Sequence, residues 1–133
     1  KSNASTLDLD KYVLWLGSRN DPERLMAACD ITTLTSNNGE GFPNSVAESM
    51  ACGTLCVATD IGDTAYIVSK FAQTVPPNNP QALATAWNLA LKQVQGNQHQ
   101  TSINIRQSII ERFASRTIAK TTIETLKKPG NHT

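Results

Sequence analysis

The pattern of apolar and polar positions predicts short buried strands in the first half of the chain. Residues 12–16 form a continuous apolar run that Gly17 closes, and such a run is typical of a buried strand. Further strands are predicted at 31–35, which is rich in β-branched residues, at 54–59 and at 73–75. Because the run at 54–59 is apolar on both faces, a parallel sheet covered by helices is expected.

Helical signals fill the spaces between these strands. Asp21 and Pro22 have the preferences of an N-cap and a first helical residue. The expected inner face of this helix consists of Leu25, Ala28 and Cys29. Residues 45–51 are predicted to form a short helix that Gly53 ends. Alternating strands and helices indicate an α/β fold, a doubly wound Rossmann-like parallel sheet with flanking helices.

The second half of the chain is predicted to be helical. Asn79 and Pro80 begin a helix, residues 96–101 are expected to form a polar loop, and Ser115 is the predicted N-cap of a final helix. The apolar positions with helical spacing are Leu83, Ala86, Trp87, Ala90, Leu91 and Val94 in the first helix, Ile105, Ile109, Ile110 and Phe113 in the second, and Ile118, Ile123 and Leu126 in the third.

Composition narrows the classes of function. A net charge of +1 over 133 residues gives no basis for nucleic-acid binding. No apolar run approaches the ~20 residues of a membrane-spanning helix. Cys29, Cys52 and Cys56 have no metal-like spacing, so buried free thiols are favoured over a zinc or redox site. Free thiols favour a cytoplasmic location.

The candidate chemistry lies in the segment after the second predicted strand. Glu40 stands in a loop between Gly39 and Gly41, and Glu48 is expected in the first turn of the following helix. The N–H groups at a helix start can bind a phosphate, and glycines let the backbone approach a ligand closely. A ribose diol at Glu48 and sugar hydroxyls at Glu40 would complete a nucleotide-sugar pocket.

A simpler interpretation stays open on spacing alone. Ser45 and Glu48 also match a capping box, which needs no ligand. A glutamate beside glycines is likewise common in turns.

Several motifs occur in order between residues 13 and 91. They are Trp15-Leu16-Gly17, Ala27-Ala28-Cys29-Asp30, Ser36 with Glu40-Gly41-Phe42-Pro43, Glu48-Ser49-Met50-Ala51-Cys52-Gly53, residues 58–62, and Val75-Pro76-Pro77. Together they resemble the C-terminal, nucleotide-sugar-binding domain of the retaining glycosyltransferases of family four, which have the GT-B fold.

The resemblance implies a hexosyltransferase that moves a sugar from a nucleoside diphosphate to an acceptor hydroxyl with retention, without a bound metal or other cofactor. Glu40 would be the catalytic residue near the transferred sugar, and Glu48 would hold the ribose. The backbone that meets the sugar and the diphosphate would be that of Gly41, Phe42, Pro43, Asn44 and Ser45. Ser18 and Arg19 match the loop near the nucleobase, although Arg19 as a solvated surface arginine is an equal alternative.

The chain also departs from the family. The resemblance implies an Arg and a Lys that neutralise the diphosphate early in the domain, and an N-terminal domain that binds the acceptor, but neither has a counterpart in this sequence. Tyr66 stands where the family often has Glu. We therefore expect residues 1–128 to be a partial domain and 129–133 to be a disordered tail. The longer parent is expected in the cytoplasm, in polysaccharide or glycolipid synthesis, with peripheral association with the inner face of the membrane as an alternative.

The family's strand order, 3-2-1-4-5-6, carries a consequence for this chain. Residues 12–16 would be strand 3, and 31–35, 54–59 and 73–75 would be strands 4, 5 and 6. Strands 1 and 2, which separate 3 from 4, have no counterpart. We therefore expect 12–16 either to pair directly with 31–35 or to leave an open edge that drives self-association.

Two other functions remain open at this stage. One is a nucleotide-sugar epimerase of similar fold, although such enzymes carry Ser-Gly-Gly where this chain has the Glu40 loop. The other is a non-catalytic nucleotide-binding fragment, which titration with nucleoside diphosphates and a transfer assay would distinguish from an enzyme.

Overall fold

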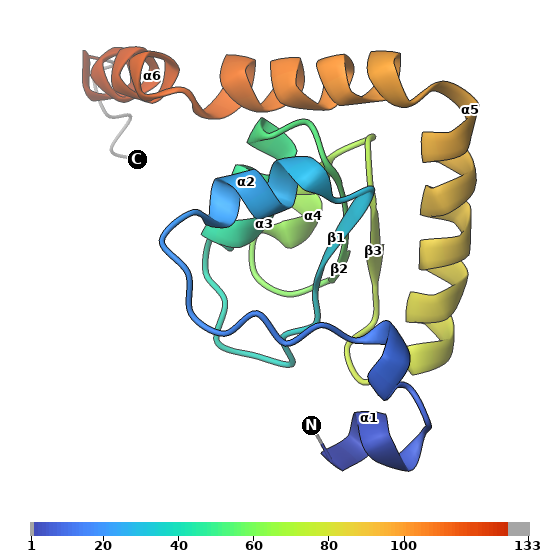
Figure 1. Ribbon diagram of the computed structural model, residues 1–133. Helices are drawn as coiled ribbons and strands as arrows, with labels where there is room; N and C mark the ends of the chain where they lie inside the picture. Colours follow the sequence, from blue (N-terminus) through green and yellow to red (C-terminus); the bar gives the residue numbers. More distant parts are fainter. Residues whose placement is uncertain (1, 128–133) are drawn as a thin grey trace.

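In the computed structural model, which describes residues 2–127, three strands form one parallel sheet (Figure 1). They are β1 (Ile31–Leu34), β2 (Leu55–Thr59) and β3 (Gln73–Val75), in that order across the sheet. Every residue of the central strand β2 is buried. The strands predicted at these positions and the α/β class are confirmed, and the strand order agrees with strands 4, 5 and 6 of the resembling family.

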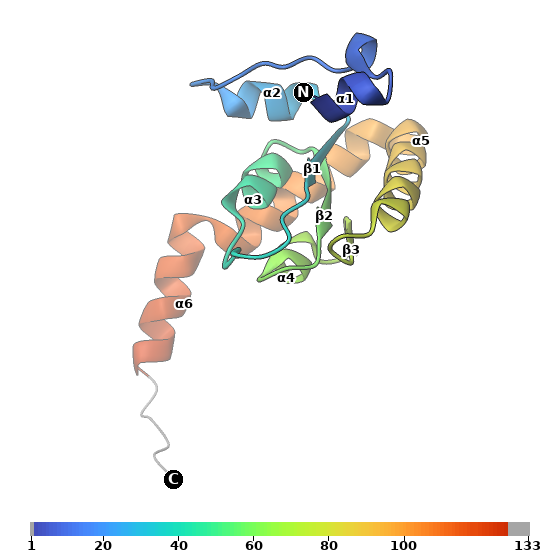
Figure 2. The ribbon, with the colours of Figure 1, turned by 90° about the horizontal axis from the view of Figure 1, so that it is seen from below.

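Helices cover both faces of the sheet. Helices α3 (Asn44–Ala51) and α4 (Thr64–Val68) pack on one face, and the first half of α5 (Pro80–Phe113) packs on the other (Figure 2). Apolar side chains from these layers meet in one core. Its buried members are Val46, Met50, Leu55, Cys56, Val57, Ala58, Ile67, Val68, Val75, Ala86, Ala90, Val94, Ile105 and Ile109.

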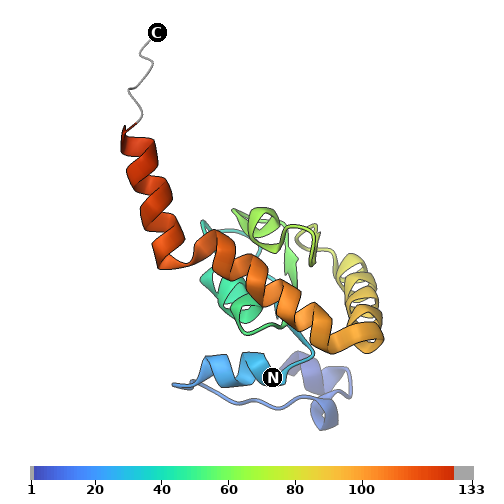
Figure 3. The ribbon, with the colours of Figure 1, turned by 90° about the horizontal axis from the view of Figure 1, so that it is seen from above.

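Helix α5 bends at Asn97, and its second half crosses the end of the sheet toward α3 (Figures 1 and 3). The predicted loop at 96–101 is therefore wrong. Only Asn97 leaves the helical conformation, and its Oδ1 accepts a hydrogen bond from the N–H of Gln100 at 3.3 Å, which caps the restarted helix. The second half of α5 then donates side-chain hydrogen bonds to backbone carbonyls at and just after the end of α3. Ser102 donates to the carbonyl of Gly53 at 2.8 Å, and Arg106 to that of Ala51 at 2.8 Å.

The last described helix, α6 (Ser115–Lys127), extends away from the rest of the molecule (Figures 2 and 3). The helix is confirmed, but Ser115 is its first residue rather than its cap, since the N–H of Ile118 bonds to the carbonyl of Ala114. None of its residues is buried. The predicted tail at 129–133 lies outside the described residues.

The predicted strand at 12–16 is wrong. Residues Asp10–Tyr12 form a 3₁₀ helix after α1 (Ser2–Thr6), and residues 13–17 have no regular structure. This segment lies beyond β1, outside the sheet (Figure 2), so the predicted direct pairing with 31–35 is wrong as well. Leu14 is 79% exposed. An apolar run becomes a strand only where backbone partners and a buried face are available, and this run finds neither.

Helix α2 (Pro22–Ala28) forms as predicted but is mostly exposed. Its predicted inner face is wrong for Ala28 and Cys29, which are exposed, whereas Leu25 is half-buried. Asp21 does not cap the helix because its carboxylate binds Arg19.

The three cysteines are free, and only Cys56 is fully buried. Among residues 2–127, no helix has the length and apolarity needed to cross a bilayer.

Candidate functional site

The loop between β1 and α3 is fixed at the carboxyl ends of the strands by two side-chain hydrogen bonds. The Ser36 hydroxyl donates to Oε1 of Glu40 at 2.7 Å. The carbonyl of Ser36 in turn accepts a hydrogen bond from the Thr59 hydroxyl, at the end of β2, at 2.7 Å. Glu40 is half-buried. Its carboxylate is therefore held in one orientation at the edge where ligands of parallel α/β sheets bind.

A glycine in the turn before α4 lets this loop pack closely. Gly62 has a φ of +56°, and a Cβ at this position would lie 2.3 Å from the carbonyl oxygen of Gly41 and 2.4 Å from that of Glu40. The N–H of Asp63 donates to the same Gly41 carbonyl at 2.8 Å. Only glycine fits here, because any side chain would displace the loop backbone at Glu40 and Gly41.

An aromatic cluster ties the same loop to the end of α5. The ring of Phe42 packs edge-on against Phe113, with centroids 5.4 Å apart, and Phe113 packs against Tyr66 at 5.7 Å. The Arg112 guanidinium lies 4.7 Å from the Tyr66 ring and 4.6 Å from that of Phe113, and it donates to the carbonyls of Tyr66 and Ile67. Tyr66, at the position where the resemblance implies a Glu, thus completes this cluster with its ring.

The start of α3 presents unpaired backbone N–H groups. Pro43 occupies the N-cap, and no side chain caps the helix. The alternative interpretation of Ser45 and Glu48 as a capping box is therefore wrong. The amides of Asn44 and Ser45 find no acceptor among the described residues. The N-terminus of this helix carries a partial positive charge and donors suited to an anion.

Glu48 lies on the outer side of α3. It is the fifth residue of the helix, so it stands in the second turn rather than in the expected first turn. The opposite side is buried through Val46, Ser49 and Met50. Glu48 is exposed, and its carboxylate has no hydrogen bond or ion pair in the described part of the chain. Its carboxylate is free to accept hydrogen bonds from a ligand.

The two residues predicted near a nucleobase lie in the N-terminal segment. Arg19 donates two hydrogen bonds of 2.8 Å to the carboxylate of Asp21, and Ser18 beside it is exposed. The Arg19 guanidinium is thus already occupied in this structure, which favours the alternative of a surface arginine.

One buried polar contact below the site was not expected from the sequence. The hydroxyls of Thr32 on β1 and Ser49 on α3 share a hydrogen bond. Burial raises the pKa of the neighbouring Cys56 thiol, and a hydrogen bond with Thr32 opposes part of that rise. Small hydroxyl residues on facing elements are the only sequence signal for this contact, which fixes α3 against the sheet.

Comparison with known proteins identifies the family to which this architecture belongs. Residues 1–93 match the family model described as "Glycosyl transferases group 1". The chain belongs to this family. The family match covers the entire candidate loop and the sheet, so the predicted relationship to family-four glycosyltransferases is confirmed.

Two curated relatives from Campylobacter jejuni, both named as N-acetylgalactosaminyltransferases, are similar to part of this chain. An N-acetylgalactosamine-N,N'-diacetylbacillosaminyl-diphospho-undecaprenol 4-alpha-N-acetylgalactosaminyltransferase is 43% identical over 54 residues. An N,N'-diacetylbacillosaminyl-diphospho-undecaprenol alpha-1,3-N-acetylgalactosaminyltransferase is 48% identical over 48 residues. These matches cover 41% and 36% of this chain but only 14% and 12% of the two relatives.

Solved structures support the same glycosyltransferase fold. Anabaena Alr3699/HepE in complex with UDP is similar to this chain with a TM-score of 0.82 and 31% sequence identity. The match covers 94% of this chain and 35% of the HepE chain. HepE in complex with UDP-glucose gives a TM-score of 0.79. A glycosyltransferase from Rickettsia africae, at 23% identity and a TM-score of 0.81, shares the fold and covers 96% of this chain. The chain therefore corresponds to about a third of the length of these structures and has the fold of a GT-B C-terminal domain.

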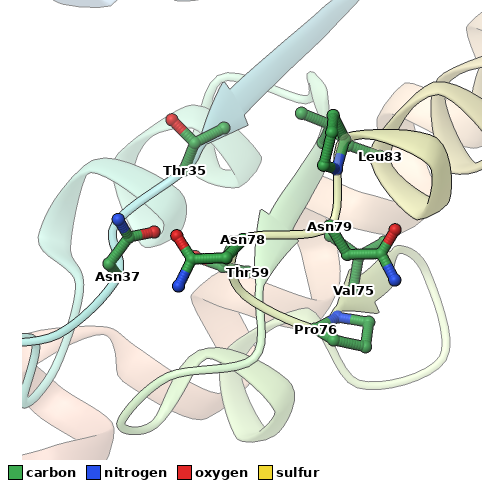
Figure 4. Close-up of a pocket in the computed structure, with 9 residues that line it drawn as sticks. Thr35, Asn37, Thr59, Val75, Pro76, Asn78, Asn79 and Leu83 are labelled. Carbon is green, nitrogen blue, oxygen red and sulfur yellow. The ribbon is translucent and has the colours of Figure 1, made fainter.

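A hollow of about 450 Å³ in this glycosyltransferase domain lies beside the loop (Figure 4). It is lined by residues that follow β1, end β2 and β3, and begin α5, but neither Glu40 nor Glu48 is among them. Sequence reasoning missed this hollow. The Val75-Pro76-Pro77 motif was the only signal, since Val75 and Pro76 line it.

Proposed function

We propose that this chain is the nucleotide-sugar-binding part of a retaining glycosyltransferase, which transfers a hexose from a nucleoside diphosphate to an acceptor hydroxyl. The observation that carries the proposal is a fixed carboxylate at Glu40 next to a helix start with free amides and an unengaged Glu48. The complexes of HepE with UDP and UDP-glucose support a uridine nucleotide as the first ligand to test.

Each part of the site has a proposed role. The diphosphate lies at the amides of Asn44 and Ser45, where the helix dipole and the backbone donors offset the charge that develops on the leaving group. Glu48 accepts hydrogen bonds from the ribose diol. Glu40, oriented by Ser36, positions the donor sugar and stabilises positive charge at its anomeric carbon. No metal is part of the proposal.

The acceptor would be bound largely by other parts of a longer protein, since the chain spans only about a third of HepE. Both Campylobacter relatives are named for acceptors carried on diphospho-undecaprenol. We include in the proposal a role in polysaccharide or glycolipid synthesis, in the cytoplasm or at the inner face of the membrane. No observation favours the epimerase alternative.

Titration of the isotope-labelled chain with UDP, followed by NMR, tests the nucleotide site. UDP is expected to shift the backbone amide signals of residues 44–48. Glu48→Gln should weaken UDP binding by about 1–3 kcal/mol, because a charged hydrogen-bond acceptor for the ribose is lost. Glu23→Gln, which changes an exposed glutamate on α2, is the matched control and should leave the affinity unchanged. Absence of any shift at 44–48, or an unchanged affinity in Glu48→Gln, would contradict the proposal.

The same titration tests the role of Glu40 separately from that of Glu48. Glu40→Ala should leave the affinity for UDP unchanged and weaken binding of UDP-glucose, because the proposed contact is with the sugar alone. Equal weakening of both ligands would show that Glu40 acts on the nucleotide or on the fold instead.

A further inference from the structure

The two glycines beside Glu40 give the backbone of its loop little steric restraint of their own. A Cβ built on either Gly39 or Gly41 would meet no atom within 4 Å. Gly39 also has a φ of +81°, a conformation that glycine adopts without steric cost. The direction of the Glu40 carboxylate therefore depends on the contacts made by the residues on each side of it.

Contacts hold the loop on both sides of Glu40. On the N-terminal side, the Ser36 hydroxyl donates to the carboxylate itself. On the C-terminal side, the ring of Phe42 packs edge-on against Phe113, in addition to the close approach of Gly62. Phe42 is the one aromatic residue in the segment 36–43. Its contact with Phe113 therefore restrains the backbone two residues beyond Glu40.

Phe113 is itself held in place by the residue before it. It is the last residue of α5 and is half-buried against the core. The Arg112 guanidinium lies 4.6 Å from the centroid of the Phe113 ring, and it donates to the carbonyl of Ile67 at 3.0 Å and to that of Tyr66. The Tyr66 ring packs edge-on against Phe113 as well. Charge-assisted hydrogen bonds and cation–π contacts of this kind fix the ring of Phe113 at the position that Phe42 meets.

We propose that Phe113 is a positioning residue that holds the Glu40 carboxylate in its observed orientation by packing on Phe42. In the reaction proposed above, on which this part rests, that orientation serves the donor sugar. Phe113 acts only through the loop and makes no contact with the ligand. The contact joins the end of α5 to a loop far away in the sequence, so no local motif around Glu40 specifies it.

NMR spectra of the labelled chain without ligand test the link between Phe113 and the loop. Phe113→Ala should shift or broaden the backbone amide signals of Gly39 and Glu40. Phe113→Leu, which fills most of the space without a ring, should do the same to a smaller extent, and it keeps the test valid if the alanine variant does not fold. Phe113→Tyr retains the ring and should leave these signals near their wild-type positions. Unchanged signals at Gly39 and Glu40 in the folded alanine or leucine variant would overturn the proposal.

Phe71 provides the matched control. It is also half-buried against the core but lies outside the aromatic cluster. Phe71→Ala should lower the denaturant midpoint, as Phe113→Ala does, without moving the signals of Gly39 and Glu40. Movement of these signals in Phe71→Ala as large as in Phe113→Ala would show a general loss of packing and overturn the proposal.

Binding measurements test the link between the loop and the sugar. Loss of the ring in Phe113→Ala or Phe113→Leu should weaken UDP-glucose binding by about fivefold, less than the loss of a whole charged hydrogen bond. UDP binding should be unchanged, because only the sugar contacts Glu40. In a Glu40→Ala background, removing the ring should have no further effect on UDP-glucose, because its effect passes through that carboxylate. Equal weakening of UDP and UDP-glucose, or an effect that persists without Glu40, would overturn the proposal.

The two kinds of measurement distinguish this inference from the proposed function. If UDP does not bind, or if Glu40→Ala binds UDP-glucose like the wild type, the proposed function fails. Shifted signals at Gly39 and Glu40 would then still support the positioning of the loop by Phe113. If UDP-glucose binds through Glu40 and the Phe113 variants bind it as tightly as the wild type, the inference is wrong and the proposed function stands.

Discussion

Two glutamates in one short segment have opposite local environments. Glu40 is half-buried and accepts a hydrogen bond from Ser36, whereas Glu48 is exposed and unengaged in the described structure. A fixed carboxylate suits the orientation of a reacting sugar, because a preorganised charge needs no rearrangement during the reaction. A free carboxylate at a helix surface suits a ligand that brings its own donors, such as a ribose diol.

The close contact at Gly62 leads to a prediction about stability. Gly62→Ala should destabilise the fold by about 2–5 kcal/mol, because the new Cβ meets two loop carbonyls and a left-handed φ adds its own cost. Gly39→Ala is the matched control. Its φ is also positive, at +81°, but no atom lies near its Cβ, so it should cost only about 1–2 kcal/mol. Denaturant unfolding measures both, and equal losses would disprove the steric role of Gly62.

The buried thiol of Cys56 gives the fold a dependence on alkaline pH. Its pKa is raised above the ordinary 9.0, chiefly by burial. The unfolded chain therefore releases this proton at a lower pH than the folded chain, so the contribution to stability is lost as pH rises through the folded pKa. Denaturant midpoints between about pH 8 and about pH 10 should fall more steeply for the wild type than for Cys56→Ala. Parallel pH profiles would show that Cys56 does not contribute.

At the scale of the structural elements, helices α3 and α5 differ in how their N-termini are capped. Helix α3 begins without a side-chain cap, whereas α5 begins with Asn79 bonded to Ala82. An uncapped start leaves amides available to a ligand at the cost of some helix stability. In the proposed function, this difference separates the helix start that binds the diphosphate from one that only packs.

Paired substitutions at these helix starts test the difference. Asn79→Ala should destabilise the chain by about 1 kcal/mol through loss of the cap. Ser45→Ala should change stability by less than about 0.5 kcal/mol, because the Ser45 hydroxyl does not cap α3. Both are measured by denaturant unfolding without ligand. A loss near 1 kcal/mol in Ser45→Ala would restore the capping box and remove the simplest support for a ligand at this helix.

At the scale of the whole molecule, large apolar side chains are exposed at both ends of the described chain. Leu14, Trp15 and Leu7 are 79%, 54% and 68% exposed in the N-terminal segment, and Leu126 on α6 is 80% exposed. Strand β1 also pairs on one side only. Surfaces of this kind are typical of sites covered by another part of a protein or by another chain.

We therefore expect the isolated chain to self-associate. Sedimentation velocity should show a concentration-dependent shift from monomer to dimer or larger species. Replacing Leu14 and Trp15 by serine should reduce the association, whereas replacing the exposed Lys120 and Glu124 on α6 should not. A monomer at all concentrations would contradict the expectation drawn from the open edge.

The sequence by itself determined the elements whose signals are local. The continuous apolar run at 55–58, the Asn79–Pro80 helix start and the ordered motifs around Glu40 and Glu48 sufficed to predict the sheet, the main helices and the family. Periodicity, capping preferences and glycine positions act over a few residues, so they can be found without coordinates.

Tertiary structure decided whatever depended on a partner distant in sequence. The apolar run at 12–16 had the composition of a strand but no neighbouring strand to pair with, and residues 96–101 became one bend because Asn97 caps a second helical half that packs on α3. The contact of Gly62 with the Glu40 loop and the hollow between the strand ends and the start of α5 were likewise absent from the local pattern. Each arises from packing between elements, whose geometry is set only when the sheet and its helices assemble.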